Sequence, residues 1–416
     1  MLNTFYDSYN ILNKVYVGGA FLKQALTETV IEEKNRAKIT KICYGVLDKD
    51  VALEYYLALL CDKKPKNSVK ILLKIGMFAI KYLENQPYAV VDNMVKLVKK
   101  MGKGGTSGFV NAVLRKFSVC EPPYIEDEIK RLSVEYSYPE FAVKRLIKDY
   151  GKETAIEIIN CDEERTTVRF CGDFDGEKYL QSIGAKFELS PFKNTFITYN
   201  FKRNADYDKG VYTFQSIGSV AICDAVPAGE KLFDACAAPG GKSVNLADKF
   251  KEVVASDIHP HRVKLIEEYA ARMNKPNVKA VLGDSSIYNA EYKDAFDCVL
   301  CDAPCSGYGV VKENPDIKLN RTDEDIKELA KLQLKLLENV ALYVKAGGYL
   351  CYSTCSVFKE ENEEICKEFL KSHGEYKEIK TVSPLRSAES EIGKQFLPHL
   401  SLGAGFYYCL FKREKQ

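Results

Sequence analysis

Apolar residues near the N-terminus recur at helical spacing. From Tyr88 to Met101, one face of the expected helix carries Val91, Met94, Val95, Val98 and Met101. A glycine-rich stretch, residues 104–108, ends this helix, and a second apolar stretch begins at Phe109. Because helical patterns dominate and strand-like runs are few, residues 1–120 are predicted to form an all-helical domain.

The pattern changes between residues 121 and 210. An amphipathic helix is predicted after Pro139, ending at Tyr150. Short strands and a short helix are expected next, at Thr166–Phe170, Glu177–Ser182 and Thr195–Tyr199. We therefore expect residues 121–210 to form a small α+β bridging subdomain.

From residue 211 to residue 416, apolar strand-like runs alternate with helical patterns. The runs are Lys231–Asp234, Glu252–Asp257, Val278–Leu282, Phe296–Cys301 and Gly348–Ser353. This alternation predicts an α/β fold, a doubly wound Rossmann-like sheet with helices on both faces. Ligands bind to such sheets beyond the carboxyl ends of the strands, where the strand order reverses.

Composition narrows the class of protein. The 416 residues are 46% hydrophobic, and no apolar stretch approaches the roughly 20 residues of a membrane span. The first segment, MLNTFYDSYN, lacks the basic and apolar parts of a secretion signal. The cysteines are therefore expected to be free thiols in a reducing compartment. We expect a soluble, cytoplasmic monomer that contacts no membrane.

The small net charge conceals an uneven distribution. Within roughly the first 118 residues, basic side chains outnumber acidic ones about two to one, and the rest of the chain is mildly acidic. Lys96, Lys99 and Lys100 lie off the apolar face of the predicted helix. Such a surface can contact RNA phosphates, although a solvated lysine face would give the same pattern.

A glycine-rich loop follows the first strand of the predicted sheet. Its residues are Cys236, Ala237, Ala238, Pro239, Gly240, Gly241 and Lys242. It resembles the end of a phosphate-binding loop, but Cys236 stands where that motif needs glycine, and the adjacent glycines do not match the dinucleotide-binding spacing. Alone, such a turn can be purely structural.

Carboxylates at three later strand ends change this interpretation. Asp257 ends the second strand, where an acid can bind a ribose diol, and Asp284 and Asp302 follow on the same edge. Together these carboxylates favour a nucleoside that carries a positive sulfonium, whereas they would repel a pyrophosphate. The alternative is that each acid caps a helix or turn. S-adenosylmethionine is the cofactor that fits best.

Two cysteine-containing segments, Asp302–Gly307 and Ser353–Ser356, also follow predicted strands. Carbon-5 of cytosine is a poor nucleophile, so methylation there requires prior addition of a thiolate to carbon-6. One thiol can add while the other assists release, and Asp302 can contact the ring. The pattern predicts a cytosine-5 methyltransferase with Cys305, Cys355 and Asp302 as catalytic candidates.

Metal binding is a competing interpretation, because Cys298, Cys301 and Cys305 superficially resemble ligand spacing. Residues three apart on a strand point to opposite faces, so Cys298 and Cys301 cannot converge on one ion. We expect no metal site and interpret Cys298, Cys301 and Cys351 as core residues.

These segments also resemble two known families. Ser107–Arg115 resembles the helical RNA-binding fold of the NusB family, as do residues 44–47 and 71–76 less specifically. The rest of the chain resembles the Sun family of RNA cytosine-5 methyltransferases. The matching segments are Tyr212–Gln215, Asp234–Lys242, Asp302–Gly307, Asn314–Lys318, Gln333, Ser353–Ser356 and Glu361–Glu363.

The resemblance implies a division of roles. In that family the counterpart of Cys355 attacks the base, and the counterpart of Cys305 assists breakdown of the adduct. It further implies that residues 236–242, Asp257, Asp284 and Asp302 bind S-adenosylmethionine. Combined with this resemblance, a NusB-like N-terminal domain implies that the target is a cytosine in small-subunit (16S) ribosomal RNA. This chain departs from the family pattern at Arg169–Cys171, Ser216, Tyr308 and Ala404, none of which carries the thiol chemistry.

Other functions stay open: methylation of another RNA such as tRNA, methylation of DNA, and RNA binding by a non-catalytic assembly factor. Paired thiols argue against the last, because binding alone needs none. The enzyme is expected to take a loop or flipped-out cytosine. Lys312, Lys318 and Arg321 are candidates for RNA contacts, or else solvated charges.

Overall fold

The computed structural model describes residues 1–161, 165–199 and 201–415. The chain forms two compact units, and the first includes a segment from later in the sequence. The first unit comprises Met1–Ala155 and Val311–Arg321, and the second comprises Ile156–Val310 and Thr322–Gln416. Each unit has its own core.

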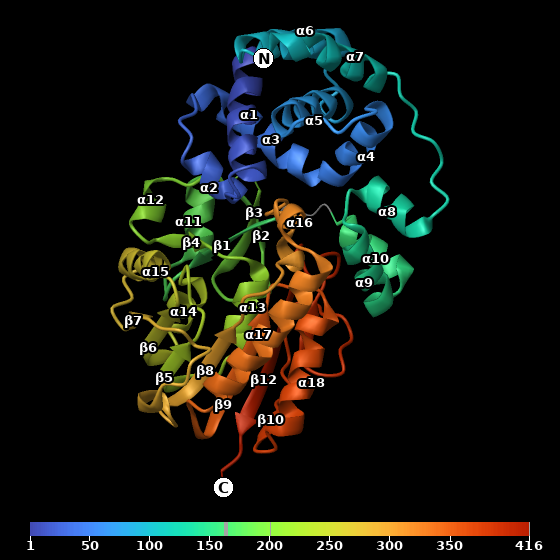
Figure 1. Cartoon of the computed structure of the whole chain (residues 1–416). Helices are drawn as coiled ribbons and strands as arrows, with labels where there is room; N and C mark the ends of the chain where they lie inside the picture. Colours follow the sequence, from blue (N-terminus) through green and yellow to red (C-terminus); the bar gives the residue numbers. More distant parts are fainter. Residues whose placement is uncertain (162–164, 200, 416) are drawn as a thin grey trace. The chain divides into compact units, whose positions relative to one another are not determined.

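The first unit is helical (Figure 1). Its central helix is α5 (Asn67–Lys81), which is buried along most of its length and packs against α1, α3, α4, α6 and α7. The bounds of the other helices are α1 Leu2–Tyr16, α2 Leu22–Thr27, α3 Glu33–Asp48, α4 Asp50–Leu60, α6 Pro87–Lys100, η1 Gly104–Thr106, α7 Ser107–Phe117, α8 Glu128–Tyr136 and α9 Glu140–Tyr150. The boundary between the two units falls within α10 (Lys152–Ile159). This confirms the prediction of an all-helical N-terminal domain.

The helix predicted from Tyr88 to Met101 is observed as α6, with Pro87 in its first turn. Its apolar face packs against α7, and Val91, Met94 and Val98 are buried. Gly102, with a φ of 70°, takes a left-handed conformation just after the helix, which favours glycine. Lys99 and Lys100 remain exposed, as the helical spacing requires.

The segment Val311–Arg321 lies within the part of the sequence predicted to form the Rossmann-like domain but belongs to the helical unit. Its short helix α16 (Ile317–Asn320) carries Lys318, whose ammonium is buried. Lys318 Nζ donates to Asp48 O at 2.6 Å, to Asp48 Oδ1 at 3.1 Å and to Ser137 O at 3.0 Å. Neither interpretation offered for Lys318, an RNA contact or a solvated charge, is confirmed, because its ammonium is buried inside the helical unit.

The second unit begins with a small antiparallel sheet of order β2-β3-β1-β4. Its strands are β1 Thr166–Phe170, β2 Lys186–Leu189, β3 Thr195–Tyr199 and β4 Tyr212–Phe214. The helices α11 (Gly176–Ser182) and α12 (Ala205–Asp208) accompany it, and Phe170, Phe196 and Tyr212 pack in its core. The α+β bridging part of the predicted fold is confirmed. The boundaries proposed for the three domains stay a prediction.

The large sheet has the order β10-β12-β9-β8-β5-β6-β7, with β11 paired to β12. Its strands are β5 Gly229–Asp234, β6 Phe250–Asp257, β7 Val278–Leu282, β8 Phe296–Asp302, β9 Val344–Thr354, β10 Tyr376–Glu378, β11 Lys394–Phe396 and β12 Phe406–Arg413. The five strands from β7 to β9 are parallel, whereas β12 is antiparallel to β9. Strand order reverses between β5 and β8, so the loops after these strands flank the ligand-binding edge.

Helices cover both faces of this sheet, as predicted (Figure 1). Helices α17 (Asp323–Ala341) and α18 (Glu363–Ser372) pack on one face, and α13 (Ile217–Ala225), α14 (Gly241–Leu246) and α15 (Pro260–Arg272) pack on the other. Short η2 (Ala290–Tyr292), η3 (Tyr308–Val310) and η4 (Lys359–Glu361) lie in connecting loops.

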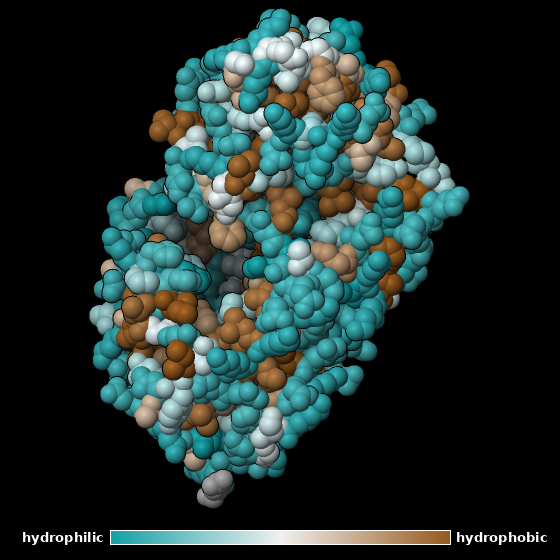
Figure 2. All heavy atoms as spheres, viewed as in Figure 1, coloured by the Kyte–Doolittle hydropathy of each residue, from teal (hydrophilic) through white to brown (hydrophobic). Residues whose placement is uncertain are grey.

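Hydrophilic side chains dominate the face of the molecule seen in Figure 2. Exposed large apolar side chains such as Val30, Tyr88 and Val119 occur in the helical unit. Among the described residues, no helix combines the length and apolar character that crossing a membrane requires.

Candidate active site

The glycine-rich loop after β5 is anchored by the neighbouring strand β6 and by the loop that follows β7. Ala237 N donates to Ser256 O at 2.8 Å, and Ser285 Oγ donates to Ala235 O at 2.7 Å. Gly240, with a φ of 104°, starts α14 in a conformation that a side chain would strain. The loop backbone can therefore approach a ligand closely at the sheet edge.

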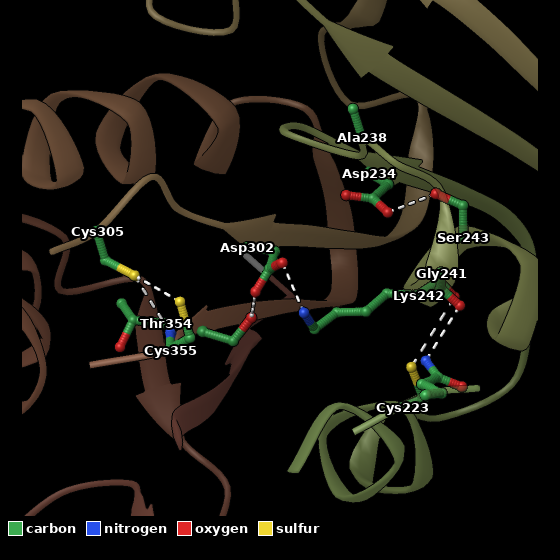
Figure 3. A network of polar contacts seen from close by, with 12 residues as sticks. Cys223, Asp234, Ala238, Gly241, Lys242, Ser243, Asp302, Cys305, Thr354 and Cys355 are labelled. Atoms are coloured by element: carbon green, nitrogen blue, oxygen red, sulfur yellow. Dashed lines mark hydrogen bonds and ion pairs between the residues drawn. The ribbon is translucent and has the colours of Figure 1, made fainter. Parts of the chain in front are cut away.

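Asp234, the last residue of β5, lies buried beneath this loop. Its Oδ2 accepts a hydrogen bond from Ser243 Oγ at 2.5 Å (Figure 3). Its Oδ1 has no hydrogen-bond partner among the described residues. Burial raises the pKa of Asp234 from 3.8 to about 7, and the hydrogen bond from Ser243 offsets only part of this effect.

An ion pair between Lys242 and Asp302 connects the glycine-rich loop to the end of β8. Lys242 Nζ lies 2.6 Å from Asp302 Oδ2, and Ser353 Oγ donates to Asp302 Oδ1 at 2.7 Å. Burial alone would lower the pKa of Lys242, but the Asp302 carboxylate raises it well above its usual range. Lys242 is therefore a fixed positive charge next to the thiols, and Figure 3 shows Asp302 between it and the cysteines.

The two candidate thiols meet in space. Cys305 follows β8 and Cys355 follows β9, and these strands are adjacent and parallel. Their Sγ atoms lie 3.1 Å apart, and Cys355 N donates to Cys305 Sγ at 3.3 Å (Figure 3). The hydrogen bond to Cys355 and burial raise the pKa of Cys305 well above its usual range, so Cys305 holds its proton.

The other predicted carboxylates lie at the expected strand ends but have local partners. Asp257 Oδ1 accepts from His259 N at 3.1 Å, and Asp257 Oδ2 lies 3.5 Å from Arg262 Nη1. Asp284 Oδ1 accepts from Ser286 N at 2.9 Å, so it also caps a turn. Asp284 lines a cavity of about 330 Å³. Their roles in cofactor binding stay predictions.

The remaining strand cysteines are buried, as expected. Cys298 and Cys351 lie in the core beneath α13, whereas Cys301 lies in the core beneath α17. This confirms that Cys298 and Cys301 point to opposite faces of the sheet. No cluster of three metal-ligating side chains occurs within residues 1–161, 165–199 and 201–415.

Sequence reasoning missed several residues that organise the site. Glu361 and Asn362 were noted only as part of a motif, but both are fully buried and bonded to the cysteine loops. Gln215 donates from Nε2 to Gly241 O at 3.1 Å and so supports the cofactor loop. A buried glutamate has no distinctive local signal, because charged residues in a short helical turn are ordinarily exposed.

Fold and site together define a Rossmann-like methyltransferase preceded by a NusB-like helical domain. Residues 222–412 match the family 16S rRNA methyltransferase RsmB/F, and residues 7–119 match the NusB family. The chain is 31% identical to the probable ribosomal RNA small subunit methyltransferase B of Bacillus subtilis, over 97% of this chain and 96% of that protein. It is 30% identical to ribosomal RNA small subunit methyltransferase B of Photorhabdus laumondii, over 96% of each. The chain belongs to the RsmB/F family of methyltransferases.

Solved structures share the fold. PH0851 superposes with a TM-score of 0.83 at 23% identity, over 99% of this chain and 98% of that chain. NSun6 from Pyrococcus horikoshii superposes with a TM-score of 0.59 at 19% identity, over 68% of this chain and 100% of that chain. The family assignment confirms the resemblance seen in the sequence and S-adenosylmethionine as the cofactor.

Proposed function

We propose that this enzyme methylates carbon-5 of a cytosine in 16S ribosomal RNA through a covalent adduct on Cys355. The observation that carries the proposal is the contact between the Cys305 and Cys355 sulfurs, 3.1 Å apart beside the Lys242–Asp302 ion pair. Binding alone requires no such thiol pair. The names of the family relatives support ribosomal RNA of the small subunit as substrate.

The reaction begins when the Cys355 thiolate adds to carbon-6 of the ring. The new carbon–sulfur bond would leave electron density at carbon-5. S-adenosylmethionine, when bound, would supply the methyl group to carbon-5, its methyl–sulfonium bond breaking to leave S-adenosylhomocysteine. A base then removes the carbon-5 proton, the carbon-5–carbon-6 double bond re-forms, and the bond to Cys355 breaks. The Cys305 thiol assists this last step, because its hydrogen bond stabilises the departing Cys355 thiolate.

Asp302, oriented by Lys242, is proposed to hold the target cytosine. The side chain of Asp302 is 27% exposed and that of Lys242 is 13% exposed, so both charged groups are largely shielded from solvent. Asp302 contacts the polar edge of the cytosine while Lys242 and Ser353 fix the orientation of its carboxylate.

The cofactor is proposed to lie across the strand ends of β5, β6 and β7. The backbone of residues 236–242 would approach it closely, Asp257 would bind the ribose, and Asp284 would contact the nucleoside. Burial, and after it the nearby carboxylates of Asp234, Asp302 and Asp257, raise the pKa of the Cys236 thiol, so these acids lie around the loop and fit the group. The negative surroundings favour a sulfonium cation.

Trapping with RNA that contains 5-fluorocytosine tests the function. Fluorine cannot leave carbon-5 as a proton does, so the wild-type protein should form an RNA adduct that survives denaturing electrophoresis. A Cys355→Ser protein should form none, and Cys61→Ser serves as a control on a half-buried thiol of the helical unit. An adduct in Cys355→Ser would assign the attack to another thiol, as expected of a DNA-type enzyme. The absence of any wild-type adduct would favour an assembly factor.

The target is tested by mapping 5-methylcytosine. Small-subunit ribosomal RNA and tRNA from cells that lack this protein are treated with bisulfite and sequenced. We expect one 16S cytosine to lose its methyl group while tRNA remains unchanged. Loss confined to tRNA would overturn the ribosomal target but not the chemistry.

A further inference from the structure

A fully buried carboxylate, Glu361, lies behind the two cysteine loops at the end of η4. Its Oε1 accepts from Ser306 N at 2.7 Å and from Gln333 Nε2 at 3.0 Å. Its Oε2 accepts from the hydroxyls of Ser306 and Ser356, both at 2.5 Å. Four donors converge on one carboxylate, which is the arrangement that stabilises a buried negative charge.

Three of the four donors belong to residues that directly follow the two cysteines in the chain. Ser306 follows Cys305, and Ser356 follows Cys355. The same Glu361 carboxylate therefore holds the residue that follows each cysteine, although the two cysteines are 50 residues apart in the sequence. Gln333, on α17, extends the clamp by donating to Pro304 O at 3.0 Å, just before Cys305.

Glu361 also acts on the proton of Cys305. The hydrogen bond to Cys355 is the largest cause of the raised pKa of Cys305, followed by burial and by the charges of Cys355 and Glu361. A negative charge behind Cys305 disfavours its thiolate. The proton then stays on the sulfur that must donate toward Cys355.

We propose that Glu361 is a positioning residue for the thiol pair, holding the Cys305 and Cys355 loops together and keeping the proton on Cys305. This inference rests on the proposed function, in which the Cys305 thiol stabilises Cys355 as it leaves the base. Glu361 touches neither sulfur, and it acts through Ser306, Ser356 and its charge.

A Glu361→Gln protein tests both actions, because it keeps the size of the side chain and removes the charge. Methyl transfer from labelled S-adenosylmethionine to RNA should show a kcat about 100-fold lower, as expected of a misplaced reacting group, with KM nearly unchanged. Alkylation of Cys305 by iodoacetamide, resolved by peptide mass spectrometry, should shift to lower pH. At pH 7 it should be faster in Glu361→Gln than in the wild type, because loss of the negative charge favours the Cys305 thiolate.

Two variants separate charge from position. Glu361→Asp keeps the charge but is too short to reach both serines, so methyl transfer should fall while the pH profile of Cys305 alkylation stays as in the wild type. Glu363→Gln is the matched control. Glu363 is also buried, but it bonds to Ser390 and pairs with Lys359, and both of its readouts should match the wild type.

An unchanged alkylation profile in Glu361→Gln would overturn the proposal. Alkylation needs no RNA, so this comparison holds even if the wild type fails to methylate cytosine, which would refute only the proposed function. If Glu361→Gln does not fold, Ser356→Ala takes its place, because it removes one donor and keeps the charge. Methyl transfer should then fall about ten-fold, as the loss of a hydrogen bond to a charged group allows, and an unchanged rate would overturn the clamp.

Discussion

The sulfur atoms of Cys305 and Cys355 lie 3.1 Å apart, at the ends of two adjacent parallel strands. Parallel pairing places the residues that follow β8 and β9 at the same sheet edge. The pKa of Cys305 is raised, so at neutral pH this pair carries a thiol beside the proposed nucleophile. The geometry therefore separates two roles for chemically identical side chains.

Replacing Cys305 with alanine should slow release of the methylated base. Without the Cys305 thiol, Cys355 leaves as an unsupported thiolate, so the adduct should accumulate on ordinary, unfluorinated RNA. Denaturing electrophoresis with labelled RNA measures the covalent fraction. Cys305→Ala should show a stable adduct, while the wild type shows little. If both proteins turn over without an adduct, Cys305 has no part in release.

The control for this variant is Cys171→Ala. Cys171 is also half-buried and lies in the same unit, but it contacts Arg169 and not the thiol pair. It should release RNA as the wild type does.

Asp234 should make stability depend on pH in the neutral range. Its pKa is about 7 in the folded protein against 3.8 ordinarily, so the folded state holds this proton more tightly. The stability that this provides is complete below pH 3.8 and is lost as pH rises through 7. Asp234→Asn keeps a neutral group at every pH. Its advantage over the wild type should grow by on the order of 2 kcal/mol between about pH 5 and pH 8.

Chemical denaturation of both proteins across this pH range measures the difference. Taking the difference cancels the titration of groups that the two proteins share. A difference that does not change with pH would mean that Asp234 titrates as an ordinary carboxylate, and that its unpartnered Oδ1 is solvated.

Basic side chains of the helical unit should contribute to RNA affinity in a salt-dependent way. Lys99 on α6 and Lys116 on α7 are exposed. If both contact phosphates, Lys99→Glu/Lys116→Glu should weaken RNA binding and reduce the slope of log K against log salt by about 0.7 to 0.9 per lost contact. Fluorescence anisotropy over a range of salt concentrations measures this slope.

A matched double variant on another helix controls for net charge. Lys34 and Lys38 on α3 are exposed as well, and Lys34 pairs with Glu32. Equal losses in Lys34→Glu/Lys38→Glu would indicate a general charge effect and not a defined RNA surface. These substitutions are preferred to deletion of the first 118 residues, because Lys318 is bound within the helical unit and would lose Asp48.

The sequence by itself determined the fold class and the positions of the chemical groups. Apolar runs specified β5 to β9. Strand β8 and the end of β9 are largely buried, which gives a continuous apolar run, whereas the edge strand β7 is only partly buried. The antiparallel strand β12 (Phe406–Arg413) was not predicted, although its run of apolar residues is equally clear. The placement of Cys305, Cys355 and the carboxylates at strand ends followed from local pattern alone.

Only the tertiary structure decided which of these groups meet. The 3.1 Å contact between the sulfurs of Cys305 and Cys355 depends on β8 lying next to β9. The hydrophobic periodicity of each strand does not predict the order of strands in the sheet. Lys318 is buried because its segment, Val311–Arg321, packs with the helical unit far away in the sequence, and Glu361 is buried because the two cysteine loops surround it. Periodicity reports what each residue faces along its own element, whereas long-range packing determines its partner and its charge state.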